Sequence, residues 1–399
     1  MAPRPLASIM GLHDIVGHEK LRTSIFRAYE SGKLPAALLL HGPRGIGKQR
    51  LALWIAQLTV CTGTATERPC DSCGPCRMVR SLEHPDVHWY FPLPRPKVSS
   101  KEKLAEALEA ARFQELSEYR VQSLVPSWWD DVRGLYLGTI TNLRNQATKR
   151  PSMAKGPVFI VGQAELLVPQ AASPEAANAL LKLLEEPPGQ ARFILTSSEP
   201  GMLLPTIKSR TVPLHVPALS REMVYAFLKD HFSVDERTGK WAAQLSQGSP
   251  GRAMAFLPDE GELGPLEDLR RRAFDIVVGA TTQNRGPGYR LAASFPSTRA
   301  RQLIDLFTLV EVWLRDLAAA TAGADKLIIN YDALARLKKH ANEAGILPSR
   351  VPSAFAAVEH ARELARGNVN PQLVVSGLVR DLRQVLLDSS IPTAAGSSR

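Results

Sequence analysis

The stretch "AALLLHGPRGIGKQRLALWIAQLTV" (residues 36–60) decides the fold of this chain. It opens with a short, continuous apolar run, which is typical of a strand buried on both faces of a parallel sheet. It closes with a helical pattern. The turn between them has the spacing G-x-x-x-x-G-K at Gly42, Gly47 and Lys48. Gly45 adds freedom inside the turn. Such glycines let backbone amides curl around phosphate at a helix N-terminus, so the sequence predicts a phosphate-binding loop (P-loop) in which Lys48 reaches the terminal phosphates.

The positions that would handle magnesium and water beside this loop carry unsuitable residues. Gln49 stands where a hydroxyl residue would ligate the metal, and the later apolar run "VFIV" ends in Gly162 and Gln163 instead of an Asp–Glu pair. Phosphoryl transfer depends on the metal and on a positioned nucleophile. We therefore expect negligible hydrolysis, while ATP or ADP binding stays open, as does a glycine turn without a ligand. The alternative is that Glu165 or the pair Asp130–Asp131 supplies the missing carboxylate.

All four cysteines of the chain lie within one short segment, in the spacing C-x8-C-x2-C-x2-C. The ligands would be Cys61, Cys70, Cys73 and Cys76. Four thiolates at this spacing suit a closed tetrahedral zinc site, which is structural because no position is left for water. Four unrelated buried thiols, or an iron–sulfur cluster, are the alternatives.

The order of apolar patterns predicts an α/β domain followed by helices. Further buried strands are expected at 158–161 and 192–198, and after residue 215 only helical patterns occur. The expected divisions are an α/β domain (1–215) containing the cysteine segment (61–76) and an insertion (about 93–138), a small helical domain (216–262), a larger helical domain (263–390) and a disordered tail (391–399).

Composition agrees with an ordinary globular protein. Of 399 residues 44% are hydrophobic and 22% are charged, and the net charge of +10 favours work near nucleic acid or an acidic partner. No apolar run approaches the roughly 20 residues of a membrane span, and the N-terminus lacks the apolar core of a signal peptide. We therefore expect a cytoplasmic protein without membrane contact.

Taken together, these motifs resemble those of the delta-prime subunits of bacterial DNA polymerase III clamp loaders, which are AAA+ proteins. The resemblance covers nearly the whole chain apart from the insertion at 93–138. It rests on the cysteines and on "HDIVGHEKLRTSIFRAYESGKLPAALLLHGPRGIGK" (13–48), "EAANALLKLLEEPP" (175–188), "LLPTIKSR" (203–210) and "ARGNVNPQLVVSGLVRDLRQVL" (365–386). It implies an AAA+ P-loop domain with a parallel sheet and a zinc-binding module, then a helical lid and an all-α collar.

The resemblance also implies a function. Delta-prime subunits have a degraded ATP site and give an arginine finger, from a Ser-Arg-Cys motif, to ATP on a neighbouring motor subunit. Arg210 occupies the matching place, although Thr211 replaces the cysteine. The implied partners are the gamma/tau motor subunits and the delta subunit, with the sliding clamp and primed DNA reached through the complex. Such a chain is not catalytic by itself but is a subunit of a DNA-directed DNA polymerase holoenzyme.

Two other functions compete with this one. An ATP-hydrolysing gamma/tau-type motor subunit would need a hydroxyl at position 49 and an Asp–Glu pair at 162–163, and the sequence has neither. A zinc-dependent nucleic-acid-binding protein with a relict P-loop would place basic or aromatic residues around the cysteines. The segment offers Arg68, Arg77 and Arg80 but no aromatic residue.

Overall fold

The computed structural model contains two compact units. It describes residues 15–64, 67–98, 100–121, 133–167, 175–258, 261–282, 286–295, 300–366 and 369–387. The first unit holds the described residues up to Met254, and the second holds those from Ala255 onward. The tail predicted at 391–399 and the pair Asp130–Asp131 lie outside the described residues.

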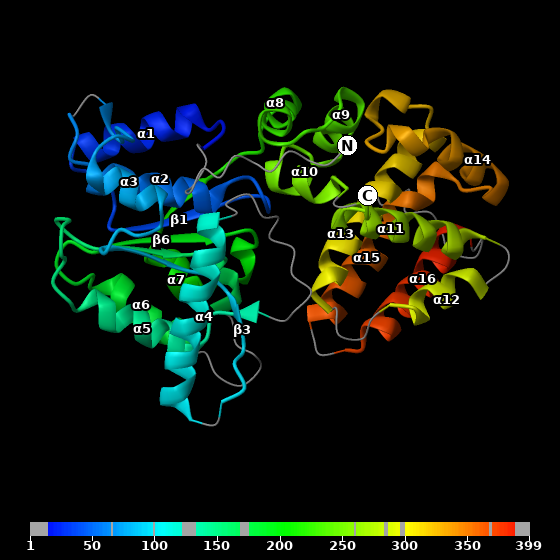
Figure 1. Cartoon of the computed structure of the whole chain (residues 1–399). Coiled ribbons are helices and arrows are strands. Elements are labelled where there is room, and N and C mark those ends of the chain that lie inside the picture. Colours follow the sequence, from blue (N-terminus) through cyan, green and yellow to red (C-terminus); the bar gives the residue numbers. More distant parts are fainter. Residues whose placement is uncertain are drawn as a thin grey trace, which may run out of the picture. The chain divides into compact units, whose positions relative to one another are not determined.

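A parallel five-stranded sheet forms the centre of the first unit (Figure 1). Its strand order is β2-β5-β6-β1-β7, and every pairing is parallel, as the sequence predicted. The strands are β1 (Ala37–His41), β2 (Val87–Tyr90), β5 (Val158–Val161), β6 (Arg192–Ser197) and β7 (Val212–His215). All four residues of β5 are buried, as expected of a continuous apolar run in a parallel sheet.

Helices cover both faces of this sheet. Side chains of β1 alternate between the two faces, because successive strand residues point in opposite directions. Leu39 joins the core under α5, α6 and α7, and Leu38 and Leu40 join the core under α1 and α2. These helices are α1 (Glu19–Glu30), α2 (Lys48–Val60), α5 (Leu137–Ala147), α6 (Glu175–Glu185) and α7 (Pro205–Ser209). The first unit also contains two short 3-10 helices, η2 (Ala164–Leu167) and η3 (Pro200–Met202).

The segment between β2 and α5 contains helix and strand. The described part has β3 (Leu93–Pro94) paired antiparallel with β4 (Arg133–Gly134), and the long helix α4 (Lys101–Val121). The helix packs on its own small core of Phe91, Leu93, Leu108 and Leu116. The residues predicted to form an insertion thus carry a separate apolar cluster beside the main sheet.

Three further helices close the first unit, and their boundaries follow ordinary capping rules. They are α8 (Arg221–His231), α9 (Glu236–Leu245) and α10 (Pro250–Phe256). Ser220 accepts a hydrogen bond from the Met223 amide at the start of α8, and Asp235 does the same for Thr238 at α9. Side-chain oxygens of this kind satisfy amides that the first helical turn leaves unpaired.

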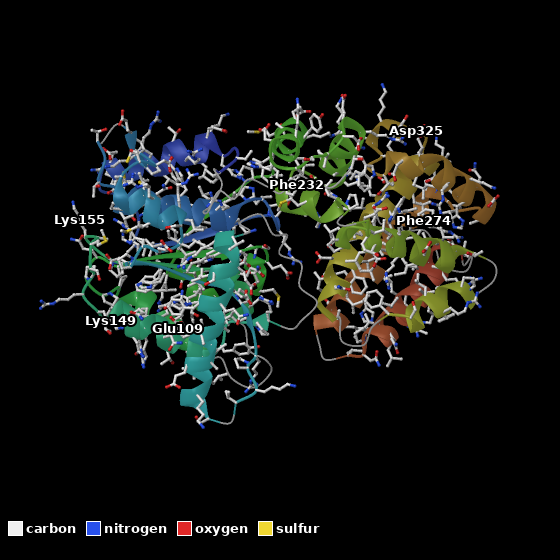
Figure 2. The ribbon with its side chains drawn as sticks, in the orientation of Figure 1. Glu109, Lys149, Lys155, Phe232, Phe274 and Asp325 are labelled. Carbon is white, nitrogen blue, oxygen red and sulfur yellow. The ribbon has the colours of Figure 1, made fainter. Side chains whose placement is uncertain are left out.

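The second unit is helical throughout its described residues. Its helices are α11 (Pro265–Thr281), α12 (Gly286–Ala293), α13 (Ala300–Thr321), α14 (Leu334–Ala344), α15 (Val351–Arg366) and α16 (Pro371–Leu387), with the 3-10 helices η4 (Asp325–Leu327), η5 (Tyr331–Ala333) and η6 (Pro348–Arg350). The apolar face predicted for α13 is buried, from Leu303 through Trp313 to Leu317. Phe274 of α11 lies among these helices, with its ring centroid 4.7 Å from that of Trp313 (Figure 2).

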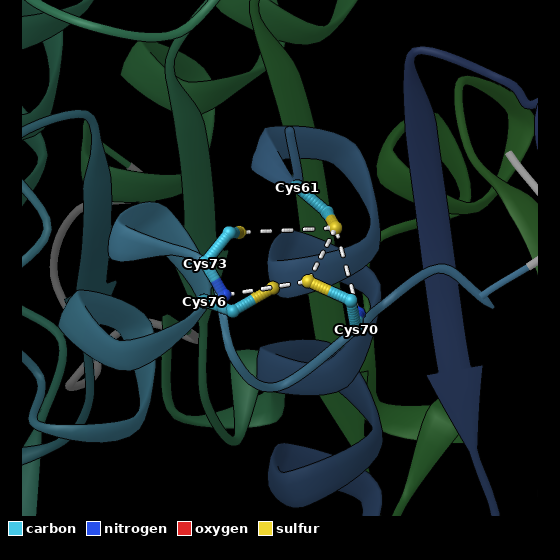
Figure 3. A group of neighbouring side chains, drawn as sticks. All are labelled: Cys61, Cys70, Cys73 and Cys76. Atoms are coloured by element: carbon cyan, nitrogen blue, oxygen red, sulfur yellow. Dashed lines mark hydrogen bonds between the residues drawn. The ribbon is translucent and has the colours of Figure 1, made fainter. Parts of the chain in front are cut away.

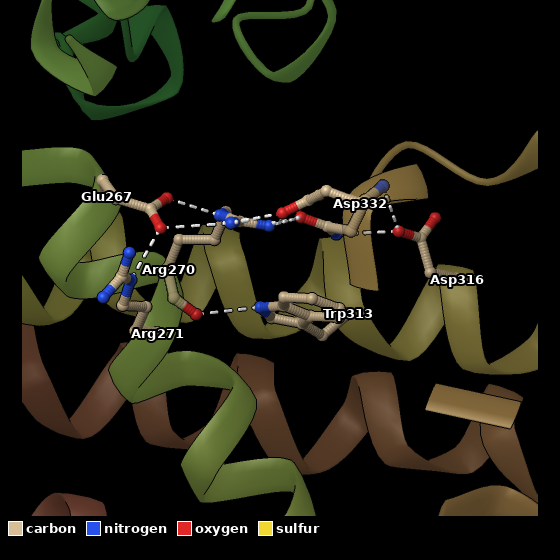
Figure 4. A network of polar contacts seen from close by, with 7 residues as sticks. Glu267, Arg270, Arg271, Trp313, Asp316 and Asp332 are labelled. Carbon is tan, nitrogen blue, oxygen red and sulfur yellow. Dashed lines mark hydrogen bonds and ion pairs between the residues drawn. The ribbon is translucent and has the colours of Figure 1, made fainter. Parts of the chain in front are cut away.

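A largely buried polar network ties α11 to α13 and to η5 (Figure 4). The Arg270 guanidinium contacts both Glu267, at 2.6 Å, and Asp332, at 2.8 Å. The Trp313 indole N–H donates to the Arg270 carbonyl at 2.9 Å. No helix in the described part of the chain is both long enough and apolar enough to cross a membrane.

A candidate nucleotide loop and metal centre

The glycine-rich loop lies between β1 and α2, where the sequence predicted it, and this brings Gly42, Gly45, Gly47 and Lys48 together. Gly45 and Gly47 have φ values of 78° and 95°, in the left-handed region that favours glycine. A Cβ on Gly42 would lie only 2.3 Å from the Val216 carbonyl oxygen. The backbone conformation and the close contact with Val216 therefore require glycine at these positions, whether or not a phosphate is bound.

Lys48 turns back into its own loop. Its ammonium donates to the carbonyl oxygens of Gly42 at 2.8 Å and Pro43 at 2.7 Å, and to the Ser198 hydroxyl at 2.9 Å. An ammonium has three donors, and these three contacts use them all. Burial lowers the pKa of Lys48 to about 8, against an opposing effect of Glu165. The cation that would meet phosphates in a P-loop is thus engaged by the protein.

Gln49 fills the place next to the end of β5. Its Oε1 accepts a hydrogen bond from the Trp89 indole N–H at 2.9 Å. A Cβ built on Gly162 would lie 2.8 Å from the same oxygen. The glutamine and the glycine are therefore sterically matched, because a larger residue at 162 would collide with the amide. Gln163 follows with φ 52°, and its N–H donates to the Thr196 hydroxyl at 3.0 Å.

Glu165 is a buried carboxyl held by the chain. Its Oε1 accepts the Ser198 N–H at 3.0 Å, and burial raises its pKa. Ser198 therefore links Glu165 to Lys48. These contacts favour a structural role for Glu165 over the substitute metal ligand that the sequence left open.

The start of α10 and the residue before it contact the loop directly. The Gly251 N–H donates to the Gly45 carbonyl at 2.9 Å, and the Ser249 hydroxyl donates to the Arg44 carbonyl at 2.8 Å. A Cβ on Gly45 would lie 2.5 Å from the Ser249 hydroxyl oxygen. The loop is thus fixed by α10 as well as by Lys48.

The four cysteines converge at the junction of α2 and α3 (Gly74–Arg80) (Figure 3). Their sulfur atoms all lie within 4.8 Å of one another, with Cys61 and Cys70 sulfurs 3.6 Å apart and Cys61 and Cys73 sulfurs 4.0 Å apart. A tetrahedral site with metal–sulfur bonds of about 2.3 Å has sulfur–sulfur edges of about 3.8 Å. The donor set and its spacing therefore fit a thiolate-bound metal.

The local electrostatics of the cluster differ from one cysteine to the next. Hydrogen bonds from the Ser72 hydroxyl and from nearby amides lower the pKa of Cys70 to about 6. Burial raises the pKa of Cys76, which comes from the first turn of α3. A cation among the sulfurs would compensate this cost, because metal ligation favours the thiolate form.

Arg210 caps the C-terminus of α7, immediately before β7. Its guanidinium forms an ion pair with Glu185 of α6 and donates to the Thr206 carbonyl at 3.1 Å. The side chain is 33% exposed and that of Glu185 is 45% exposed. Both partners therefore belong to the surface of the first unit.

Sequence reasoning missed the hydrogen bond between Trp89 and Gln49. Trp89 lies 40 residues after Gln49, so no local pattern connects them. The signal would have been the pairing of β2 with β5, in which Trp89 stands beside Ile160, two residues before Gly162. Sequence reasoning also missed the contact between Ser249 and the loop, across 205 residues.

Comparison with known proteins gives a consistent result. Residues 17–220, just over half of the chain, match the model of the family described as "DNA polymerase III, delta subunit". The DNA polymerase III subunit delta' of Escherichia coli is 24% identical over 362 residues, which are 90% of this chain and 92% of that protein. The DNA polymerase III subunit tau of Salmonella typhimurium is 23% identical over 359 residues, which are 88% of this chain.

The relatives differ in how much of their length the chain matches. It spans 47% of the Salmonella typhimurium tau subunit and 35% of the Escherichia coli tau subunit. Among solved structures, a DNA polymerase III gamma subunit-related protein from Thermotoga maritima has a TM-score of 0.37 and 14% identity, covering 91% of this chain and 98% of that one. From the family match, the chain belongs to the DNA polymerase III delta-subunit family of clamp-loader AAA+ subunits.

Proposed function

We propose that this chain is a delta-prime-type subunit of a clamp loader, which does not hydrolyse ATP and gives Arg210 to the ATP site of a neighbouring subunit. The observation that carries the proposal is the contact of Gln49 with Trp89 beside Gly162. The Gln49 amide occupies the space that a magnesium-binding carboxylate at position 162, just after β5, would need. A gamma/tau-type motor subunit needs that space for the metal.

We propose that any nucleotide is bound weakly and without turnover. A phosphate entering the loop would have to displace the Gly42 and Pro43 carbonyls from Lys48. It would also have to fit beside α10, whose Gly251 already donates to Gly45. We propose that the loop is kept as a structural joint between β1, α2 and α10.

Arg210 is suited to act in trans. Its ion pair with Glu185 is partly exposed on both sides, and such pairs are worth only about 0–1 kcal/mol. The triphosphate of ATP on a neighbour carries more charge than one carboxylate, so it would compete well for the guanidinium. There the planar donor fork would stabilise charge that develops in the transition state. The replacement of cysteine by Thr211 leaves this chemistry unchanged.

Zinc and partners complete the proposal. Cys61, Cys70, Cys73 and Cys76 would hold one structural Zn²⁺, whose chemistry is to lock four thiolates in a tetrahedron. The partners would be gamma/tau motor subunits and a delta subunit, with the sliding clamp and primed DNA reached through the assembled ring. The protein would act in the cytoplasm, because bacterial DNA replication takes place there.

The deciding experiment is a reconstituted clamp loader in which only this chain is changed. Arg210→Ala should assemble normally and should slow hydrolysis at the one motor site it faces; arginine fingers in GTPases are worth about 10³–10⁵ in rate. Arg210→Lys should rescue poorly, because an ammonium lacks the planar fork. Lys208→Ala, an exposed cation of the same helix, is the matched control.

The readouts are single-turnover hydrolysis and clamp loading. Because other motor sites keep their own fingers, clamp loading should suffer more than bulk ATPase. Wild-type values for both in the Arg210→Ala complex would refute the finger assignment. Failure of the wild-type chain to enter the ring, together with strong DNA binding by the isolated chain, would favour the zinc-dependent nucleic-acid-binding alternative.

A further inference from the structure

Glu185, the last residue of α6, carries the carboxylate that pairs with Arg210. A carboxylate is unfavourable at this end of a helix, because the last carbonyls of the helix carry partial negative charge. The next residue, Glu186, adds a second exposed carboxylate to the same end. In the described part of the chain only the first of these two carboxylates contacts the guanidinium. The pair is thus a specific contact and not a general attraction between a cation and an acidic surface.

Both residues of the pair extend from the same rigid frame. Leu184, directly before Glu185, belongs to the core on this face of the sheet, and so does Ile207 of α7. Thr211, directly after Arg210, is 6% exposed and donates its hydroxyl hydrogen to the Ile207 carbonyl at 3.0 Å. Because the backbone is fixed on both sides, the carboxylate and the guanidinium stay within reach of each other. The pair can therefore re-form whenever nothing else binds the guanidinium.

The other contacts of Arg210 also lie within its own subunit. Its Nη1 donates to the Thr206 carbonyl at 3.1 Å and lies 3.4 Å from the Ser209 hydroxyl oxygen. These two acceptors are neutral, whereas Glu185 is charged, and hydrogen bonds to a charged acceptor are the stronger ones. A phosphate oxygen from outside the chain would therefore have to compete chiefly with the Glu185 carboxylate.

We propose that Glu185 restrains Arg210, and that only a group with more negative charge than one carboxylate draws the guanidinium away. The restraint presupposes the proposed finger function of Arg210. The triphosphate of ATP on the neighbouring subunit has the charge that is required. An exposed ion pair is weak, so ATP overcomes the restraint at a small cost in rate. Glu185 does not touch ATP and acts only through Arg210.

The test uses the reconstituted clamp loader in which only this chain is changed. The phase of single-turnover hydrolysis that Arg210→Ala slows identifies the site that the finger faces. Glu185→Gln keeps the size of the side chain and removes its charge, so it should speed this phase about two- to fivefold, which is the range that an exposed ion pair allows. Glu186→Gln makes the same change at the next exposed residue and should leave the rate unchanged.

The direction of the change separates a restraint from a structural role, since a variant that damages α6 would slow the reaction. A double variant adds a second check. In an Arg210→Ala chain, Glu185→Gln should have no further effect, because no guanidinium remains to be released. Gel filtration checks that every variant enters the ring.

The outcomes also separate the restraint from the proposed function. Wild-type hydrolysis in the Arg210→Ala loader rejects the finger, and the restraint falls with it. If Arg210→Ala slows hydrolysis but Glu185→Gln leaves it unchanged or slows it, the finger stands and the restraint is overturned. Equal speeding by Glu186→Gln, or speeding that persists in the Arg210→Ala background, also overturns it. Speeding by Glu185→Gln alone that requires Arg210 supports it.

Discussion

Gln49 carries the chemical difference between this loop and an ATP-hydrolysing one. In place of a hydroxyl that would ligate magnesium, it presents an amide that reaches the Trp89 indole 40 residues away. Trp89 is itself held by aromatic neighbours, with ring centroids 5.1 Å from Phe91 and 5.3 Å from Tyr119. The residue that we propose to be unable to bind the metal thus connects α2 to the aromatic cluster beside α4.

This contact can be measured by its removal. Gln49→Ala would leave the indole N–H without its acceptor, and an unpaired donor of this kind costs about 1–3 kcal/mol in the free energy of unfolding. Trp89 is only partly buried, so we expect the lower end of that range. In a Trp89→Phe background the same substitution should cost much less. A double-mutant cycle by urea unfolding tests this, and equal costs in both backgrounds would exclude the coupling.

The cysteine segment has the side chains to be organised by a bound metal ion instead of an apolar core. From Cys61 to Cys76 the chain has the short helix α3 at its end, and its cysteines are the groups that converge. The rest of the first unit has two large apolar cores of its own, one on each face of the sheet. Loss of the metal should therefore be felt locally.

We expect about one equivalent of zinc per purified chain, and removal with a chelator should raise amide exchange in α3 and the preceding loop. Helix α6, on the other face of the sheet, is the internal control and should keep its protection. Cys73→Ser should bind markedly less zinc, because a thiolate ligand is lost. Elemental analysis below half an equivalent in the wild-type chain would contradict the site.

The network around Arg270 allows a matched comparison within one helix. Arg270 and Arg271 both contact Glu267, but the Arg270 side chain is 7% exposed and that of Arg271 is 60% exposed (Figure 4). Arg270→Met should destabilise the second unit by about 3 kcal/mol, at the low end of the cost of breaking a buried ion pair, because Glu267, whose side chain is 5% exposed, would keep only the exposed Arg271 as its cation. Arg271→Met should cost no more than about 1 kcal/mol. Hydrogen exchange of α11 and α13 measures both, and equal effects would refute the argument.

The sequence predicted helices and strands well where the spacing of apolar residues follows the buried face of the element. The strand at 158–161 and the apolar face of α13 are buried as expected, because a buried face imposes its own repeat on the chain. The gathering of four cysteines was equally visible in their spacing. The contact of Ser249 with Arg44 was not visible, because it depends on how α10 packs against a loop 205 residues away. Long-range polar contacts leave no local pattern in the sequence.

At the scale of the whole molecule, the chain combines a sheet-based unit with a helical unit, and its net charge is +10. Among the described residues, the sheet-based unit holds the loop, the cysteines and Arg210. The proposed finger acts on ATP that a neighbouring subunit holds. Its effect is therefore to be measured in the assembled loader.

The isolated chain should accordingly release no phosphate from ATP above background. Lys48→Ala should leave that background unchanged, because the ammonium serves its own loop. A sensitive phosphate-release assay on matched preparations of both proteins makes the measurement. A steady-state rate that Lys48→Ala abolishes would show an active site in this chain.

The steric match between Gln49 and Gly162 also limits how either position can change. An aspartate restored at 162 alone would meet the glutamine amide, since even a Cβ there comes within 2.8 Å of Oε1. A serine at position 49 alone would leave the Trp89 indole N–H without its hydrogen-bond acceptor. Either substitution alone should thus lower stability before any metal ligand set is complete. The two positions are sterically coupled, so each residue restricts which residue the other can be.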